Sequence, residues 1–281
     1  MKLIAIDMDG TLFSNNHTIS ENNCHAILKA QRQGHIVTFC SGRALHDIQE
    51  IIKKINLEAP IIAGNGAVVF HNKILQTLTI PVHILKKIMD IFNDFQLYYE
   101  IYTNKGIFID KTRKEYLYAE LNRLKDDPVF GPMVEQMVQV QNDQNHLLTV
   151  SDFSELNFSM LDPYKMYTVS LDEKKLNHLQ QRLSERDDIS ITNGSHLTVE
   201  VGNKQVSKGN ALLFLANYFQ IPQADTVAIG DNLNDLSMFK AAGTSIAMGN
   251  ATDFVKSHAK FVTKMNDDDG VAYALEKFVL S

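Results

Sequence analysis

Short apolar runs alternate with amphipathic helical patterns at both ends of this 281-residue chain. The expected strands are 2–7, 35–40, 60–63, 226–229 and 244–247, and the expected helices are 21–33, 44–54, 207–219, 233–241 and 271–280. An alternation of this kind is typical of βαβ units, which pair their strands in parallel. The two ends of the chain are therefore predicted to build one α/β domain around a Rossmann-like, doubly wound parallel sheet.

The middle of the chain follows a different pattern. Helices are expected at 82–95, 112–125 and 173–186, strands at 97–103, 106–110, 166–171 and 189–193, and a polar stretch at 138–145. The pattern changes near Pro81 and again near Val199, as expected of an α+β unit inserted into an α/β domain. We therefore predict a two-part body with the first domain at 1–81 and 199–281 and the inserted domain at 82–198.

Composition argues against several classes of function. A net charge of -6 and a pI near 5.9 give no basic field that would attract nucleic acid or anionic lipid. The N-terminal run Leu3–Ile6 is too short for a signal peptide, and no other apolar run approaches membrane-spanning length. Two cysteines, Cys24 and Cys40, cannot hold a metal cluster alone and fit a reducing compartment. We therefore expect a cytoplasmic protein without nucleic-acid or membrane partners.

Polar motifs follow the expected strands at the edge of the sheet where ligands gather. They are Asp7-Met8-Asp9-Gly10-Thr11, Ser41-Gly42-Arg43, Lys208 at the start of an expected helix, and Gly230-Asp231-Asn232-Leu233-Asn234-Asp235. Each alone has an ordinary interpretation as a polar turn, a helix cap or a solvated lysine. Their joint occurrence at strand ends and a helix start favours a single functional site.

Phosphoryl transfer is the chemistry that needs this set of residues. Carboxylates repel a phosphate group, so their presence implies a hard cation, and oxygen ligands favour Mg²⁺. Asp7 and Asp231 would hold the ion. One carboxylate with a free oxygen can attack phosphorus, and a second can act as general acid and base. Because alternate residues of a strand point the same way, Asp7 and Asp9 are expected on one side of the site.

The remaining polar residues suit a charged transition state. The Ser41 hydroxyl and the Gly42 N–H, at a helix N-terminus, can donate to phosphoryl oxygens. Lys208 can neutralise the charge that the nucleophile and the phosphate share. Asn234 and Asp235 could coordinate the cation through water or orient Lys208.

The segments DMDGT, CSGR, VSKG and GDNLND resemble the four motifs of the haloacid dehalogenase superfamily, in their usual order. With GNGA at 64–67, the wider pattern is similar to that of the Cof-type phosphatases, in which a large α+β cap is inserted between the second and third motifs. The resemblance covers 1 to about 82 and about 199 to 281. It implies that 1–81 and 199–281 form the core domain and that 82–198 form the cap domain. The cap region carries no motif that we can place.

The resemblance also implies roles for individual residues. Asp7 is expected to be the nucleophile, Asp9 the general acid and base, and Asp231 a Mg²⁺ ligand beside the backbone carbonyl of Asp9. Ser41, which stands where threonine is commoner, and Lys208 are expected to contact the phosphate. The full expected set comprises catalytic residues Asp7, Asp9, Ser41 and Lys208, substrate-binding residues Gly10, Ser41, Gly42, Arg43, Asn65, Lys208 and Asn234, and metal-binding residues Asp7, Asp9, Asp231 and Asp235.

The expected function is Mg²⁺-dependent hydrolysis of phosphate monoesters through an aspartyl-phosphate. The expected partner is a small phosphorylated metabolite, such as a sugar phosphate or a cofactor phosphate, and the expected state is a monomer or homodimer. A phosphomutase of the same superfamily is the nearest alternative. A phospho-accepting signalling domain would use a similar acidic cluster but is much shorter and would leave Asp9 without a task. A regulatory protein that has lost catalysis is opposed by the intact catalytic set.

Overall fold

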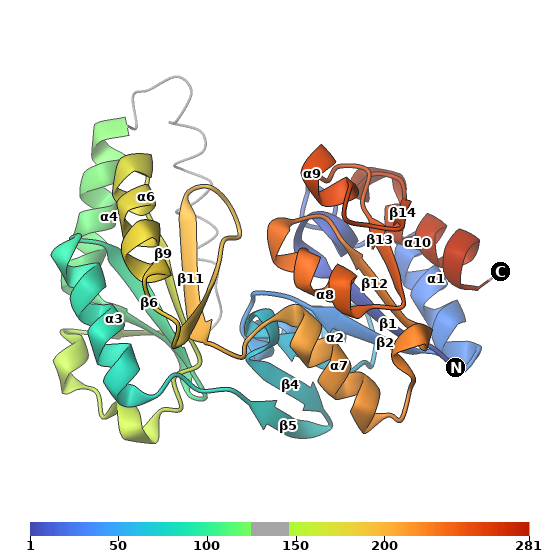
Figure 1. Cartoon of the computed structure of the whole chain (residues 1–281), viewed down its shortest axis with the longest axis horizontal. Coiled ribbons are helices and arrows are strands. Elements are labelled where there is room, and N and C mark those ends of the chain that lie inside the picture. The colour runs from blue at the N-terminus through green and yellow to red at the C-terminus, as the bar shows by residue number, and fades with distance from the viewer. Residues whose placement is uncertain (125–145, 281) are drawn as a thin grey trace. The chain divides into compact units, whose positions relative to one another are not determined.

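The computed structural model describes residues 1–124 and 146–280. The chain divides into two compact units, Met1–Thr77 with Gln205–Ser281, and Leu78–Lys204 (Figure 1). The chain passes between these units a few residues away from the expected crossings at 81/82 and 198/199. The second crossing comes later because Thr198–Asn203 is a strand of the second unit's sheet. The polar stretch expected at 138–145 lies outside the described residues.

An eight-stranded sheet in the order β14-β13-β12-β1-β2-β3-β4-β5 runs through the first unit. Its strands are β1 (Leu3–Asp7), β2 (Ile36–Cys40), β3 (Ile61–Ala63), β4 (Val68–His71), β5 (Lys73–Thr77), β12 (Thr226–Gly230), β13 (Thr244–Ala247) and β14 (Phe261–Val262). Neighbouring strands from β14 to β3 are parallel, and β4 and β5 add an antiparallel hairpin. The expected parallel sheet is confirmed.

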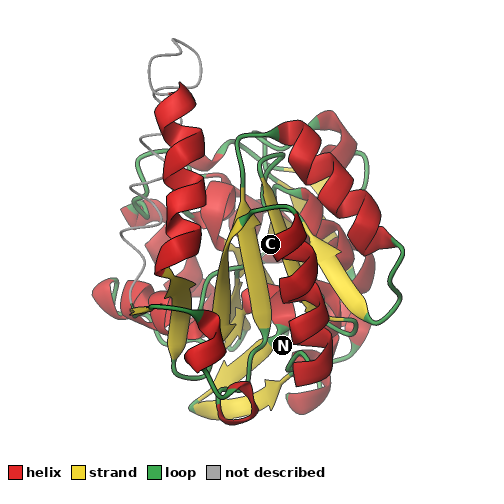
Figure 2. Ribbon diagram, turned by 90° about the vertical axis from the view of Figure 1, so that its left-hand side faces the viewer, coloured by secondary structure: helices red, strands yellow, loops and turns green. Residues whose placement is uncertain are grey.

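Helices pack on the sheet of the first unit (Figure 1), and Figure 2 distinguishes helices from strands by colour throughout the described residues. They are α1 (Glu21–Arg32), α2 (Leu45–Lys54), α7 (Lys208–Tyr218), α8 (Leu236–Ala241), α9 (Asp253–Lys256) and α10 (Gly270–Ala274). The Ser20 side chain caps α1 by accepting a hydrogen bond from the N–H of Asn23 at 3.1 Å. Apolar residues of α7 and α8 join Leu3 and Ala5 of β1 in one buried cluster.

The chain winds away from β1 in two opposite directions. The unit β1–α1–β2 leads toward β3, whereas β12–α8–β13 leads toward β14. Because such crossovers are right-handed, α1 and α8 cover opposite faces of the sheet, and the switch point lies between β1 and β12. Ile6 lies opposite Ile229 in the parallel register. Asp7 and the residues after Gly230 therefore meet where a ligand is expected.

A second sheet, in the order β10-β11-β9-β6-β7-β8, organises the second unit. Its strands are β6 (Tyr98–Thr103), β7 (Gly106–Asp110), β8 (Leu147–Val150), β9 (Lys165–Val169), β10 (Ile189–Thr192) and β11 (Thr198–Asn203), and its helices are α3 (Val82–Asp94), α4 (Lys111–Leu124) and α6 (Glu173–Ser184). Apolar residues of α3 and α6 pack against Tyr99 and Val201. Those of α4 pack with Tyr98 and Val169. Successive side chains of a strand point to opposite faces, so helices cover both faces of this sheet.

Several expected elements differ in detail. The helix expected at 233–241 is a 3₁₀ turn, Leu233–Asp235, followed by α8, because the Asp235 carboxylate binds backbone N–H groups just before it. The helix expected at 271–280 is α10 followed by a π-helical turn, Leu275–Val279. The segment 12–19, between β1 and α1, contains a turn closed between Ser14 and Thr18 and no strand. Among the described residues, no helix is both long and apolar enough to span a membrane.

The close contact of α7 with α8 predicts an unusual effect of a helix-favouring substitution. Alanine at Gly209 should gain about 1 kcal/mol of helix propensity. Its Cβ would, however, overlap the Ser237 carbonyl oxygen. We expect Gly209→Ala to lower the free energy of unfolding by about 1–3 kcal/mol, measured by urea denaturation. Asn217→Ala, at an exposed position of the same helix, should be neutral or slightly stabilising; a stabilised Gly209→Ala protein would contradict this packing.

Candidate active site

The candidate active site is built around the buried ammonium group of Lys208. Lys208 begins α7, where the Ser207 side chain accepts a hydrogen bond from the N–H of Asn210 at 3.0 Å. The Nζ atom of Lys208 donates to Asp7 Oδ1 at 2.5 Å and to Asp235 Oδ1 at 2.6 Å. Its side chain is 0% exposed. An unpaired charge at this depth would be very costly, so the two carboxylates are what make the position of Lys208 tolerable.

Both carboxylate oxygens of Asp235 have hydrogen-bond donors. Oδ1 accepts from Lys208, and Oδ2 accepts the N–H groups of Asp231 at 2.9 Å and Asn232 at 3.0 Å. The side chain is completely buried. Asp235 therefore shapes the loop that follows β12 and orients Lys208. Of the two roles expected from its sequence, this geometry favours orientation over direct metal binding.

Asp231 follows β12 and is tied to the DMDGT turn. The Oγ1 atom of Thr11 donates to Asp231 Oδ1 at 2.8 Å. Gly10 has a φ of 80°, and a Cβ there would overlap the Asp231 carboxylate, so glycine is required both by the turn and by the close approach. Thr11 belongs to this site although motif reasoning did not single it out. The sequence feature that points to Thr11 is its place inside the DMDGT motif.

Burial and repulsion by neighbouring charge raise the pKa values of Asp7 and Asp231. Burial, reinforced by the charge of Asp235, raises the pKa of Asp7 well above its usual value. The same two causes raise the pKa of Asp231 to about 6. Burial lowers the pKa of Lys208, but the carboxylates of Asp235 and Asp7 outweigh it and hold that pKa above its usual value. One ammonium group therefore does not compensate the three carboxylates.

The donor set of this cluster fits a hard divalent cation. Carboxylate oxygens of Asp7, Asp231 and Asp235 lie within 4.8 Å of one another. An all-oxygen set with excess negative charge is the kind that Mg²⁺ prefers. Because Asp235 is already engaged by its donors, Asp7 and Asp231 are the carboxylates best suited to coordinate an ion. The Asp9 carboxylate is not part of this group.

Ser41 lies in a loop beside the cluster. It follows β2, one residue after the position opposite Asp7 in the register, and is 1% exposed. Its Oγ atom accepts the N–H of Arg43 at 3.1 Å, and its carbonyl oxygen accepts the N–H of Asn65 at 2.9 Å. Asn65 in turn accepts a hydrogen bond from Asn234 Nδ2 at 3.2 Å. The buried Oδ1 atom of Asn234 has no hydrogen-bond partner among the described residues.

Asp9 forms a separate ion pair with Arg43. Arg43 Nε donates to Asp9 Oδ2 at 2.8 Å and its Nη2 donates to Oδ1 at 2.6 Å, which is a bidentate pair. The guanidinium group also lies over the Phe13 ring, 5.5 Å from its centre. The Asp9 side chain is 47% exposed. Since β1 ends at Asp7 and a π-helical turn follows, the strand alternation used to align Asp7 with Asp9 does not apply to Asp9.

One further contact to the DMDGT turn lies outside the expected site residues. Asn250, which follows β13, donates from Nδ2 to the carbonyl oxygen of Gly10 at 2.8 Å. Asn250 lies in the turn beyond the end of β13, on the ligand-binding edge of the sheet, and this place after an expected strand is its sequence signal.

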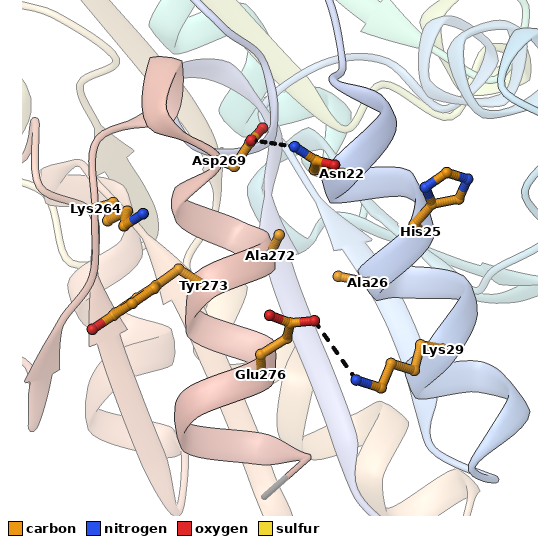
Figure 3. A pocket seen from close by; sticks show the side chains of 9 residues that line it. All are labelled: Asn22, His25, Ala26, Lys29, Lys264, Asp269, Ala272, Tyr273 and Glu276. Atoms are coloured by element: carbon orange, nitrogen blue, oxygen red, sulfur yellow. Dashed lines mark hydrogen bonds and ion pairs between the residues drawn. The ribbon is translucent and has the colours of Figure 1, made fainter.

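A separate hollow of about 290 Å³ lies between α1 and α10 (Figure 3). Asp269 faces it and accepts hydrogen bonds from Ser20 at 2.5 Å and Asn22 at 2.6 Å. Lys29 pairs with Glu276 at 3.6 Å. These charged groups pair with their own neighbours rather than converging on a common point, so we assign no ligand to this hollow.

Comparisons with known proteins agree with the expected fold. A family model for haloacid dehalogenase-like hydrolases matches residues 4–275. The chain is 34% identical to the Bacillus subtilis phosphatase YwpJ, over 98% of this chain and 99% of that one. It is also 34% identical to the 5-amino-6-(5-phospho-D-ribitylamino)uracil phosphatase YwtE of the same organism, over 99% and 98%. A solved haloacid dehalogenase-like hydrolase from B. subtilis has a TM-score of 0.88 at 33% identity, covering 99% of this chain and 100% of that chain.

The burial of Lys208 predicts a strong coupling with Asp235. Lys208→Met would leave the Asp235 carboxylate buried without its cation and should lower the free energy of unfolding by about 3–5 kcal/mol at neutral pH. The double variant Lys208→Met/Asp235→Asn should be less destabilised than Lys208→Met, because the neutral amide at position 235 replaces the carboxylate that has lost its cation. Urea denaturation of the two singles and the double completes a double-mutant cycle. Additive effects would contradict a direct ion pair.

Proposed function

The chain belongs to the haloacid dehalogenase-like hydrolase family, and from this premise we propose that it is a Mg²⁺-dependent phosphatase acting on small phosphorylated metabolites through an aspartyl-phosphate. The observation that carries the proposal is the contact of buried Lys208 with Asp7 at the switch point of the sheet, next to Asp231. A nucleophilic carboxylate needs one oxygen free for attack and its charge balanced. Lys208 binds Oδ1 of Asp7 and so supplies part of this charge balance.

Asp7 and Asp231, with the backbone carbonyl of Asp9, are the proposed Mg²⁺ ligands. When bound, the ion would neutralise phosphate charge and orient the phosphoryl group. The chain itself would contribute Lys208 as a fixed positive charge beside the nucleophile. Thr11 holds Asp231 through Oδ1 and so restricts the orientation of that carboxylate.

The chemistry requires a nucleophile and a proton carrier. An oxygen of Asp7 attacks phosphorus, the bond from phosphorus to the ester oxygen breaks, and Asp9 gives its proton to the departing oxygen. Water then attacks the aspartyl-phosphate and loses a proton to Asp9, which releases inorganic phosphate and restores Asp7. The bidentate contact with Arg43 would orient the Asp9 carboxylate for both transfers.

The loops after β2 and β3 are the proposed phosphate cradle. Ser41 and Gly42 lie just before α2, where a hydroxyl and backbone N–H groups can donate to phosphoryl oxygens. The Asn65–Asn234 contact joins this loop to the one that follows β12. Arg43 and Gly10 complete the proposed substrate-binding set. The buried, unpaired Oδ1 of Asn234 is suited to accept a hydrogen bond from a hydroxyl group of the substrate rather than to contact a phosphoryl oxygen.

The two compact units would divide chemistry from specificity. We assign catalysis to the core unit, Met1–Thr77 with Gln205–Ser281, because it holds every residue of the expected catalytic set. The unit Leu78–Lys204 would act as the cap that selects the leaving group. One relative is named for a phosphorylated ribityl compound, which supports sugar or cofactor phosphates as the substrate class. We propose that the protein acts on such metabolites in the cytoplasm, as a monomer or homodimer.

A metabolite panel tests this function directly. Phosphate release from sugar phosphates, pyridoxal phosphate, flavin mononucleotide and phosphorylated ribityl compounds would be measured with Mg²⁺ and with chelator. We expect release of inorganic phosphate that depends on the metal. Transfer of the phosphoryl group to a second metabolite would identify a phosphomutase, and activity of a protein with no bound metal would refute the proposed ligand roles.

Replacement of Asp231 should weaken the stabilisation of the protein by Mg²⁺. An ion that binds the native protein but not the unfolded chain raises the midpoint of thermal unfolding. Asp231→Asn removes one proposed ligand and should reduce the Mg²⁺-induced rise to less than about half. Without metal, the variant should be at least as stable as the wild type, because one repelling charge is gone. Asp267→Asn, at an exposed position of the 3₁₀ turn Asn266–Asp268, is the matched control and should keep the full Mg²⁺ response. An unchanged Mg²⁺ response in Asp231→Asn would exclude Asp231 as a ligand.

If Asp9 is the proton carrier, its replacement should slow phosphoenzyme formation by different factors for different leaving groups. An alkoxide is a strong base and needs protonation, whereas p-nitrophenolate needs little help. Asp9→Asn should therefore slow phosphoenzyme formation from the best alkyl phosphate of the panel at least about tenfold more than from p-nitrophenyl phosphate. Rapid acid quench separates this step from hydrolysis, which should slow for both substrates. Equal losses in the formation step would show that Asp9 is not the general acid.

A further inference from the structure

Two asparagine side chains outside the charged cluster hold the backbone of the DMDGT turn. Asn250 Nδ2 donates to the carbonyl oxygen of Gly10 at 2.8 Å. Asn250 Oδ1 accepts the N–H of Asn266 at 3.0 Å, and Asn266 Nδ2 donates to the carbonyl oxygen of Phe13 at 3.0 Å. Asn250 and Asn266 thus form an amide relay that spans the turn from its middle to the residue that follows it.

The turn has a backbone conformation that benefits from this support. Asp9 (φ -78°, ψ 118°) and Gly10 (φ 80°, ψ -1°) depart from helical angles inside the π-helical turn Met8–Leu12. Glycine imposes few steric limits on its own dihedral angles, so hydrogen bonds largely decide how the peptide after Gly10 is oriented. The amide of Asn250 makes such a bond directly beside Asp9 in the sequence.

The amide relay is anchored to the strand end that carries Asp231. Met248 donates its N–H to the carbonyl oxygen of Gly230 at 2.9 Å, and Gly249 donates to that of Lys264 at 2.8 Å. A Cβ at Gly249 would lie 2.8 Å from the backbone carbon of Lys264, so the two segments can approach only because this residue is glycine. Asn250 therefore has a defined position relative to β12. The hydrogen bond from its amide fixes the Gly10 carbonyl group relative to the same strand.

We propose that Asn250 is a positioning residue for the acid step: by holding the Gly10 peptide, its amide keeps Asp9 where its carboxyl group can reach the leaving oxygen. The inference rests on the proposed function, because it assigns Asn250 a part in proton transfer. Arg43 holds the same residue by its carboxylate, and Asn250 holds the adjoining backbone. A small displacement of a proton donor is enough to slow catalysis strongly.

Two variants separate the donor of Asn250 from its acceptor. Asn250→Ala removes both contacts of the side chain, whereas Asn250→Asp keeps the acceptor for the Asn266 N–H and loses the donor to Gly10. Both should slow phosphoenzyme formation from the best alkyl phosphate of the panel about tenfold or more, but from p-nitrophenyl phosphate less than about threefold. KM for p-nitrophenyl phosphate should stay within about twofold, because no substrate contact is removed.

A second readout does not depend on turnover. The amide nitrogen of Thr11 belongs to the peptide whose carbonyl accepts from Asn250, so its ¹⁵N resonance should shift in both variants. Asn22→Ala is the matched control, since Asn22 also donates from its amide to the loop that contains Asn266, but at Asp269. It should change neither the Thr11 resonance nor the ratio of the two formation rates.

The outcomes are distinguishable from failure of the proposed function. Asp9→Asn, measured beside the Asn250 variants, should show the largest difference between the two substrates. If Asp9→Asn shows the difference and Asn250→Asp, folded, slows both substrates equally or neither, Asn250 is structural only and the inference is overturned. If Asp9→Asn shows no difference, the proposed acid role fails and the inference fails with it. Should Asn250→Ala not fold, Asn250→Asp decides alone.

Discussion

The contact of Lys208 with Asp7 and Asp235 is the interaction on which the core unit depends. A buried ammonium group is tolerated only when its counter-charges are close, and here they come from β1 and from the loop after β12. The start of α7, the end of β1 and the end of β12 must therefore converge on one point. Gly209 serves this need, because it lets α7 approach the backbone at Ser237.

The sequence predicted the parts of the structure that depend on local pattern. Asp7, Ser41 and Asp231 each follow a run of apolar residues, and parallel strands bring such positions to one edge. The sequence did not indicate β11 for a physical reason. The strand pairs with β9, which is distant in the sequence, and with β10, and it carries the charged residue Glu200 at its centre. Glu200 is acceptable there because Lys165 donates to it at 2.9 Å, a long-range pairing that no local pattern indicates.

The candidate site shows the same limit of sequence reasoning. Motifs brought together the residues that carry charge, because phosphoryl transfer requires those residue types. Motifs could not show that Arg43 holds the Asp9 carboxylate, or that Asp235 has both oxygens engaged. Asn250 was also out of reach, since its contact joins a side-chain amide to a backbone carbonyl 240 positions away and involves no charge.

The absence of charge on Asn250 has a physical advantage at this place. Burial and the charge of Asp235 already raise the pKa values of Asp7 and Asp231, so a further ion in contact with these two carboxylates would change their affinity for a cation. Lysine at position 250 could donate to the Gly10 carbonyl but would bring a positive charge toward Asp231. Aspartate could accept from the Asn266 N–H but could not donate to the Gly10 carbonyl oxygen. The Asn250 amide orients the backbone through both its donor and its acceptor, and it adds no charge to the cluster around Lys208.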